Sequence, residues 1–281
     1  MPRGIVPRQP AKTGRQEGAQ AIRTKLKPVT GESFRAKAKK SVKAPTDSKS
    51  KGKCSRYNPL DPNRISSILQ SLDKLYPDVK CALDHADAWQ LLVATILSAQ
   101  STDVNVNRVT PELFRKYPTV QDFARITPEQ LQPDIYSTGF FRNKAKSVVG
   151  AAQKIVNEFD GKVPCEMDKL LTIPGVARKT ANVVLGSWFN IADGVVVDTH
   201  VTRISRRLEL TKETDPKKIE QDLMKVIPRE KWILFSHQII WHGRKICFAR
   251  SPKCVDCPLE TLCHAADKTW STVEIHKSAK P

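Results

Sequence analysis

Residues 168–185 read DKLLTIPGVARKTANVVL. This pattern predicts a short apolar helix, a tight turn at Pro174-Gly175-Val176, and a second helix that begins near Ala177. Backbone N–H groups at such a turn and at the following helix N-terminus point outward, and Gly175 permits the turn conformation. The segment is therefore suited to bind a DNA phosphate without reading sequence. Because a Pro-Gly pair between helices is more often an ordinary corner, this function needs support from elsewhere.

The rest of the folded chain also has helical periodicity. Nearly every junction carries Pro, Gly, Asp or Thr. The run Val195–Val197 resembles a strand but is too short to make a sheet. An all-α fold with short connections follows. The expected helices are one between Pro62 and Pro77, a buried central one at 87–99, one capped by Asp103 and stopped by Pro118, and others near 128–136, 142–159, 168–173, 177–189, 199–208, 216–226 and 231–241.

Positive charge is concentrated at the start of the chain. Of 281 residues, 47 are Lys or Arg and 29 are Asp or Glu, so the net charge is +18. Residues 1–56 hold sixteen of these basic residues and three of the acidic ones, which gives +13 there and leaves +5 for the remainder. Such a surplus indicates nucleic acid or, less often, an anionic membrane surface. We expect residues 1–56 to be a disordered basic tail, either an electrostatic arm for DNA or a solvated extension.

No apolar run is long enough to span a bilayer, and the N-terminal residues lack the apolar core of a secretory signal. Seven cysteines without such a signal favour a reducing compartment over a disulfide framework. The expected location is intracellular and DNA-associated, in the cytoplasm or nucleoid if the source is bacterial. No membrane partner is expected.

Four cysteines near the C-terminus follow the spacing C-x6-C-x2-C-x5-C: Cys247, Cys254, Cys257 and Cys263. Structural zinc sites usually pair two short C-x2-C knuckles, and only one occurs here. A single tight loop suits a four-thiolate iron–sulfur cluster better, with a zinc-containing DNA-binding protein as the alternative. Basic side chains interleave the ligands and indicate a polyanion nearby: Arg244, Lys245, Arg250 and Lys253.

Lys179 falls in the first turn of the second predicted helix, next to Arg178. A helix N-terminus disfavours an ammonium, and a neutral lysine amine is a nucleophile that can form a Schiff base. Nearby phosphates act in the opposite direction. The alternative is a surface lysine that neutralises a phosphate, which is the usual function of lysine in a basic protein.

Asp198 ends an apolar run and opens the next predicted helix. This position suggests a partly buried carboxylate facing a cleft, where it could stabilise positive charge on a sugar or accept a proton. The alternative is a simple helix N-cap, and the two are compatible. We interpret His200 as a structural hydrogen-bonding residue rather than a catalytic base.

The chain resembles endonuclease III, in the helix-hairpin-helix DNA glycosylase superfamily, from about residue 58 to 265. Five motifs carry the resemblance in the family's order: LLVATILSAQSTDVNVN (91–107), STGFFRNKA (137–145), LLTIPGVARKTANVVL (170–185), VVDTH (196–200) and HGRKICFARSPKCVDCPLETLC (242–263). It implies two helical lobes with a DNA-binding cleft between them and a C-terminal loop that holds a [4Fe–4S] cluster. The implied domains are 81–191 with six helices and the hairpin, 57–80 with 192–270 around the cluster, and a tail at 271–281.

The resemblance also implies functions for single residues. Lys179 matches the nucleophilic lysine and Asp198 the catalytic aspartate. Gln100 matches a residue inserted into the duplex, with a helix-terminal polar residue as its alternative. Phe140 matches a wedge position, with core packing as its alternative. The expected DNA contacts are Gln100, Phe140, Gly175, Val176, Ala177, Arg178, Arg244, Lys245, Arg250 and Lys253.

One position departs from the family pattern, because Ala177 stands where relatives often have the hairpin's second glycine. If the site needs a positive φ, alanine costs on the order of 1 kcal/mol. If the residue begins the helix, alanine is favourable there.

The implied function is a bifunctional DNA glycosylase and abasic-site lyase of base excision repair. It would remove oxidised pyrimidines from duplex DNA and cleave abasic sites by β-elimination through a lysine Schiff base, as a monomer. An adenine-type mismatch glycosylase is less favoured, because those relatives lack a lysine at position 179. A non-catalytic helix-hairpin-helix DNA-binding protein would need neither Lys179 nor Asp198.

Overall fold

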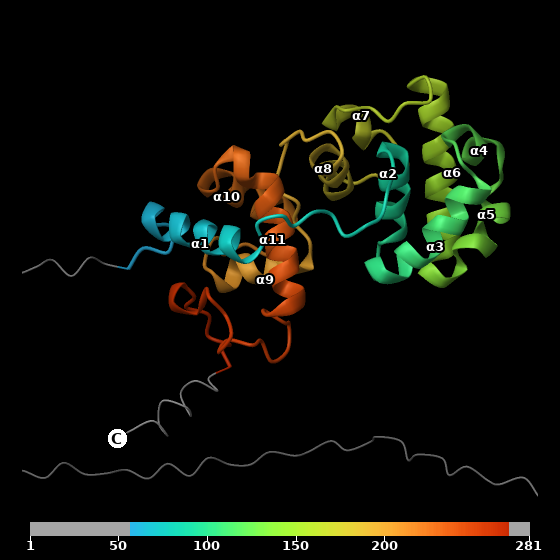
Figure 1. The fold of residues 1–281 in the computed structure, drawn as a ribbon. Coiled ribbons are helices and arrows are strands. Elements are labelled where there is room, and N and C mark those ends of the chain that lie inside the picture. Colours follow the sequence, from blue (N-terminus) through green and yellow to red (C-terminus); the bar gives the residue numbers. More distant parts are fainter. Residues whose placement is uncertain (1–56, 270–281) are drawn as a thin grey trace, which may run out of the picture. The chain divides into compact units, whose positions relative to one another are not determined.

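The computed structural model describes residues 57–269, so the predicted tails at 1–56 and 271–281 lie outside the described residues. Eleven α-helices and three short 3-10 helices form this region, which contains no strand (Figure 1). The all-α prediction is therefore confirmed. The α-helices are α1 Pro62–Leu75, α2 Ala88–Leu97, α3 Asp103–Lys116, α4 Val120–Arg125, α5 Pro128–Ile135, α6 Phe141–Glu158, α7 Met167–Leu171, α8 Arg178–Ser187, α9 Thr199–Arg207, α10 Pro216–Val226 and α11 Trp232–Lys245. The 3-10 helices are η1 Tyr136–Thr138, η2 Arg229–Lys231 and η3 Glu260–Leu262.

Two hydrophobic clusters stabilise this region. The first takes its buried side chains from residues 83–185, and the second takes them from 65–72 and 195–259. Helix α2 belongs to the first cluster, where it packs against α3, α6 and α8 (Figure 1). Trp89 and every residue from Leu91 to Leu97 are buried, as expected of the central helix. The domain boundaries implied by the resemblance stay a prediction.

The sequence prediction was wrong about the start of α3 and missed one helix, α4. Thr102, not Asp103, caps α3: its Oγ1 accepts a hydrogen bond from the backbone N–H of Asn105 at 3.2 Å. Asp103 is the first helical residue, where a carboxylate is favourable near the positive end of the helix dipole. Helix α4 was missed, although Thr119 and Asp122 form a capping box at its start.

Helix α11 is longer than predicted and ends at Lys245 rather than at 241. Arg244 and Lys245 therefore lie in its last turn, not in the cysteine loop as expected, and cations are favourable at that end of a helix dipole. Val195–Val197 is buried without forming a strand, and it leads directly into the N-terminus of α9. Within residues 57–269 no helix is both long and apolar enough to cross a membrane.

Candidate active site and cysteine-lined cavity

The turn between α7 and α8 requires glycine for two reasons. Gly175 has φ +77, in the left-handed region, and a Cβ there would lie 2.5 Å from the Cβ of Ser147. Ala177 is different, because its φ is −91 and it occupies the N-cap position of α8. The position needs no positive φ, so alanine causes no strain there. The departure from the family pattern leaves the hairpin geometry intact.

The N-terminus of α8 is available for an anion. Ala177 provides no side-chain cap, and the first backbone bond within the helix runs from the N–H of Ala181 to the carbonyl of Ala177 at 3.0 Å. The N–H groups of the preceding first-turn residues have no helical acceptor, as at any helix start. Together with the helix dipole they favour an anion at this position, and binding of a DNA phosphate there stays a prediction.

The predicted catalytic pair lines one cavity. Lys179, in the first turn of α8, and Asp198, which precedes α9, both contribute to its wall. The Lys179 side chain is exposed and forms no ion pair or hydrogen bond with the residues that the structure describes. Its amine is therefore not held by a carboxylate and can reach a ligand in the cavity. The same wall contains Val183 of α8 and Ile240 of α11, so elements of both hydrophobic clusters meet there.

Asp198 also caps α9. Its Oδ1 accepts a hydrogen bond from the backbone N–H of Val201 at 2.8 Å, and the side chain is half-buried. One carboxylate oxygen thus caps the helix while the residue also lines the Lys179 cavity, and its catalytic function stays a prediction. Burial lowers the pKa of the neighbouring His200 below its usual value, although the charge of Asp198 acts in the opposite direction. A neutral ring that accepts from Arg203 Nη2 at 3.2 Å fits the structural function expected for it.

An ion pair that no sequence pattern predicted also lines the Lys179 cavity. Arg244 Nη2 lies 2.6 Å from Asp103 Oδ2, and both residues line the cavity with Lys179. Asp103 comes from α3 and Arg244 from the end of α11, so 141 residues separate them. Such a pairing leaves no local signal in the sequence. Arg244, which is predicted to bind phosphate, is therefore held in place by the carboxylate of Asp103.

Arg178 is similarly held by an acidic residue. Its Nε donates to Oε2 of Glu220 at 2.8 Å, and that carboxylate also accepts from Nδ2 of Asn182 at 2.8 Å. Glu220 lies on α10 and is 5% exposed, so Arg178 neutralises a buried charge. Hydrogen bonding to Glu220 raises the pKa of Arg178 above its usual value. The ion pair with Glu220 connects the start of α8 to α10. Contact of Arg178 with DNA stays a prediction.

The two predicted duplex-inserting residues lie on exposed turns. Gln100 follows the end of α2 with φ +56, and Phe140 precedes α6 with φ +49. Gln100 is exposed, and Phe140 is 62% exposed. Core packing, the alternative for Phe140, is therefore wrong. An exposed aromatic side chain on a left-handed residue is available to insert into DNA.

The remaining predicted cations, Lys245, Arg250 and Lys253, do not line the Lys179 cavity. Lys245 lies over the ring of Trp241, with its Nζ 4.7 Å from the ring centroid, and Lys253 lies 5.8 Å from that of Phe248. Arg250 is exposed in the loop that carries the cysteines. Their contacts with phosphate stay a prediction.

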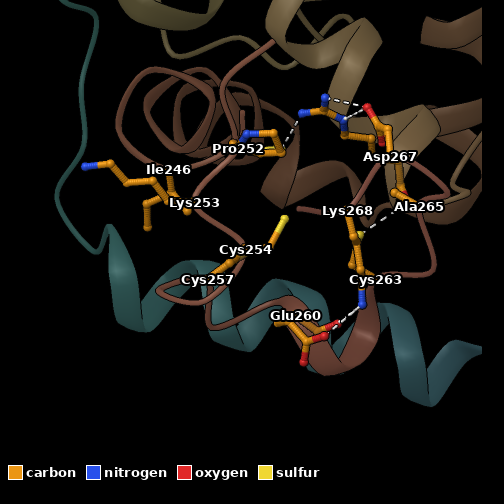
Figure 2. A pocket seen from close by; sticks show the side chains of 12 residues that line it. Ile246, Pro252, Lys253, Cys254, Cys257, Glu260, Cys263, Ala265, Asp267 and Lys268 are labelled. Atoms are coloured by element: carbon orange, nitrogen blue, oxygen red, sulfur yellow. Dashed lines mark hydrogen bonds and ion pairs between the residues drawn. The ribbon is translucent and has the colours of Figure 1, made fainter. Parts of the chain in front are cut away.

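The four clustered cysteines line a second cavity (Figure 2). Cys247 follows the end of α11, and Cys254, Cys257 and Cys263 line the same cavity. Across residues 57–269 no group of three or more His, Cys, Asp or Glu side chains is arranged to hold a metal ion. Four thiols around one cavity are nevertheless the donor set that a four-iron cluster takes, with one thiolate for each iron.

Burial shapes the chemistry of these thiols. It raises the pKa of Cys257 to about 11 and also raises the pKa of Cys263. Buried thiols become good ligands when a metal centre replaces their protons. Arg207 supports the site, because its Nη1 donates to Sγ of Cys247 at 3.2 Å and to the carbonyl of Phe248 at 2.7 Å. The donor set and its cationic neighbour therefore fit an iron–sulfur cluster.

Comparison with known proteins agrees with this geometry. A sequence profile described as HhH-GPD superfamily base excision DNA repair protein matches residues 93–229. The class that the hairpin and the Lys179 cavity define is thus that of the helix-hairpin-helix base excision repair proteins.

Comparison with individual relatives identifies the family within this class. Endonuclease III of a Synechocystis species is 58% identical over 203 residues, covering 72% of this chain and 93% of the relative. Endonuclease III of Bacillus subtilis is 41% identical over 210 residues, covering 74% and 95%. A solved structure of a trapped endonuclease III–DNA covalent intermediate is 41% identical, with a TM-score of 0.70 over 73% of this chain and 96% of that one. The chain belongs to the endonuclease III family.

Proposed function

We propose that this chain is a bifunctional DNA glycosylase and abasic-site lyase that acts on oxidised pyrimidines in duplex DNA. The observation that carries the proposal is the shared cavity of Lys179 and Asp198 beside the open N-terminus of α8. A relative trapped with DNA as a covalent intermediate supports the same chemistry. The partner is double-stranded DNA with damaged bases or abasic sites. The corresponding location is intracellular and DNA-associated.

The first steps follow from the positions of these groups. The hairpin binds a phosphate through backbone N–H groups, and the damaged nucleotide leaves the base stack at a cost of about a few kcal/mol. The Nζ of Lys179 attacks C1′ of the deoxyribose while the glycosidic bond breaks, and the base leaves with the bonding electrons. Asp198 stabilises the positive charge that develops on the sugar and takes up the proton that the amine loses.

Strand cleavage uses the resulting imine. Opening of the sugar ring gives a Schiff base between Nζ and C1′, which acidifies the C–H bond at C2′. Loss of that proton and departure of the 3′ phosphate give β-elimination, and water then hydrolyses the imine and frees Lys179. No step needs an oxidant or a reductant.

The decisive test separates this function from the adenine-type alternative. A duplex with one oxidised pyrimidine and a duplex with adenine opposite an oxidised guanine are each incubated with the full chain. We expect base release and a β-elimination strand break from the first duplex only, resolved on a denaturing gel. Release of adenine without strand cleavage would support the alternative instead. Binding of both duplexes without any reaction would support a non-catalytic DNA-binding protein.

We also propose that Cys247, Cys254, Cys257 and Cys263 hold a [4Fe–4S] cluster. When bound, the cluster supplies a rigid anchor for the loop that carries Arg250 and Lys253. We expect the purified chain to be yellow-brown and to contain about four iron atoms and four sulfides. Cys254→Ser should lose most of the iron, while Cys165→Ser, an exposed cysteine outside the cavity, should keep it. One zinc and no sulfide per chain would contradict the proposal.

A further inference from the structure

Gln100 and Phe140 share a costly backbone conformation. Both are non-glycine residues with positive φ, at +56 and +49. A left-handed residue of this kind costs on the order of 1 kcal/mol or more, and it persists only where the surrounding structure fixes it. Contacts with other groups must therefore fix the Gln100 turn (residues 98–101) and the Phe140 turn (residues 136–140).

One buried side chain contacts both turns. Lys144 is 5% exposed, and its Nζ donates to the carbonyl of Leu97 at 2.7 Å and to that of Thr138 at 2.7 Å. Leu97 is the last residue of α2, directly before the Gln100 turn, and Thr138 lies within the Phe140 turn. A single ammonium therefore joins two segments that are about forty residues apart in the chain.

The backbone of Lys144 strengthens the same link. Its N–H donates to the carbonyl of Phe140 at 3.1 Å, because Phe140 is the residue from which α6 starts. The side chain and the main chain of one residue thus fix Thr138 and Phe140 together. The hydrogen bond to Thr138 constrains the backbone before Phe140, and the hydrogen bond to the carbonyl of Phe140 constrains the backbone after it.

A second link joins the two turns nearer to the surface. Nδ2 of Asn105, on α3, donates to the carbonyl of Ser137 at 2.9 Å and to Oγ of Ser101 at 3.2 Å. Ser101 belongs to the Gln100 turn and Ser137 to the Phe140 turn. Two independent polar side chains therefore crosslink the same pair of turns.

A buried ammonium at this position is expensive. Burial lowers the pKa of Lys144, and no carboxylate in the described part of the chain forms an ion pair with it. Its acceptor Leu97 O lies at the C-terminus of α2, the negative end of that helix dipole, which offsets part of the cost. A methionine of similar length would fill the space without the desolvation penalty. Packing alone therefore does not explain a lysine here.

We propose that Lys144 is a positioning residue that joins the Gln100 turn and the Phe140 turn into one rigid unit, so that both side chains enter the duplex together. The inference rests on the proposed function, since it needs Gln100 and Phe140 to contact DNA. Lys144 itself is buried and contacts neither the DNA nor the reacting sugar.

A double-mutant cycle tests this link. The probe is a duplex with a stable tetrahydrofuran abasic analogue, and its Kd is measured for the full chain, Gln100→Ala, Phe140→Ala and the double variant. The same four measurements are repeated in a Lys144→Met background. We expect the two substitutions to be non-additive with Lys144 present, by about fivefold or more, and additive in the Lys144→Met background. The same coupling factor in both backgrounds, or none in either, would overturn the proposal.

Two further arms keep the result unambiguous. If Lys144→Met does not fold, as judged by thermal unfolding, the cycle is repeated with Lys144→Gln, which removes the ammonium but keeps a polar side chain at the same position. That background should also make the two substitutions additive, and unchanged coupling would overturn the proposal. Borohydride trapping on a single-stranded abasic oligonucleotide, where no base must leave a stack, should be equal for the wild type and Lys144→Met. Loss of trapping in Lys144→Met would overturn the positioning function, whereas no trapping by the wild type would refute the proposed function itself.

Discussion

Lys179→Gln should form no covalent adduct with an abasic-site duplex in the presence of borohydride, whereas the wild type should form one. Borohydride reduces an imine to a stable amine, so an adduct records attack by a lysine Nζ on C1′. Lys179 lines the cavity with Asp198 and forms no ion pair with the described residues. We expect strand cleavage to fall by on the order of 10³ or more, because the nucleophile is lost. A denaturing gel measures both products.

The matched control is Lys179→Arg. Arginine keeps the positive charge beside the phosphate site, and its guanidinium stays protonated in proteins, so it cannot form the imine. If Lys179 only neutralised a phosphate, Lys179→Arg would keep activity and Lys179→Gln would lose duplex affinity. If Lys179 is the nucleophile, neither variant forms an adduct, and Lys179→Arg still binds the duplex. An adduct from Lys179→Gln equal to that of the wild type would assign the chemistry to another amine.

Local sequence patterns predicted much of the fold because helices are governed by near neighbours. The apolar stretch of α2, the proline that begins α1 and the glycine turn at 174–176 all act within a few residues of themselves. Helix α4 was missed because six residues contain too little periodicity, and only its capping box could have revealed it. The end of α11 was placed four residues too early, although no proline follows 241 before the cysteine loop.

The site was only partly predictable, for a related reason. Lys179 and Asp198 each belong to a recognisable local motif, so both could be selected, but their shared cavity could only be inferred from the resemblance. The acidic partners Asp103 and Glu220 left no such signal. Each contacts an arginine far away in the sequence, and single-sequence spacing carries no information about such pairs. Lys144 was missed because a lysine in an amphipathic helix is usually exposed.

Asp198→Asn separates the two functions of that residue. Asparagine is as good an N-cap as aspartate, so its side-chain oxygen can still accept from the backbone N–H of Val201, which now lies 2.8 Å from Oδ1. We expect the free energy of unfolding and the affinity for an abasic-analogue duplex to stay close to those of the wild type. The negative charge is lost, however, and with it the stabilisation of a cationic sugar. Base excision in single-turnover assays should therefore fall by about 10²–10³.

Asp198→Ala provides the contrast, because it removes the cap as well as the charge. This variant should lose about 1 kcal/mol of folding stability, measured by thermal or denaturant unfolding, in addition to the loss of excision. If Asp198 served only as a cap, excision would follow stability, so Asp198→Asn would be fully active and only Asp198→Ala would be impaired. If the charge is what matters at the Lys179 cavity, both variants lose excision equally while only one loses stability.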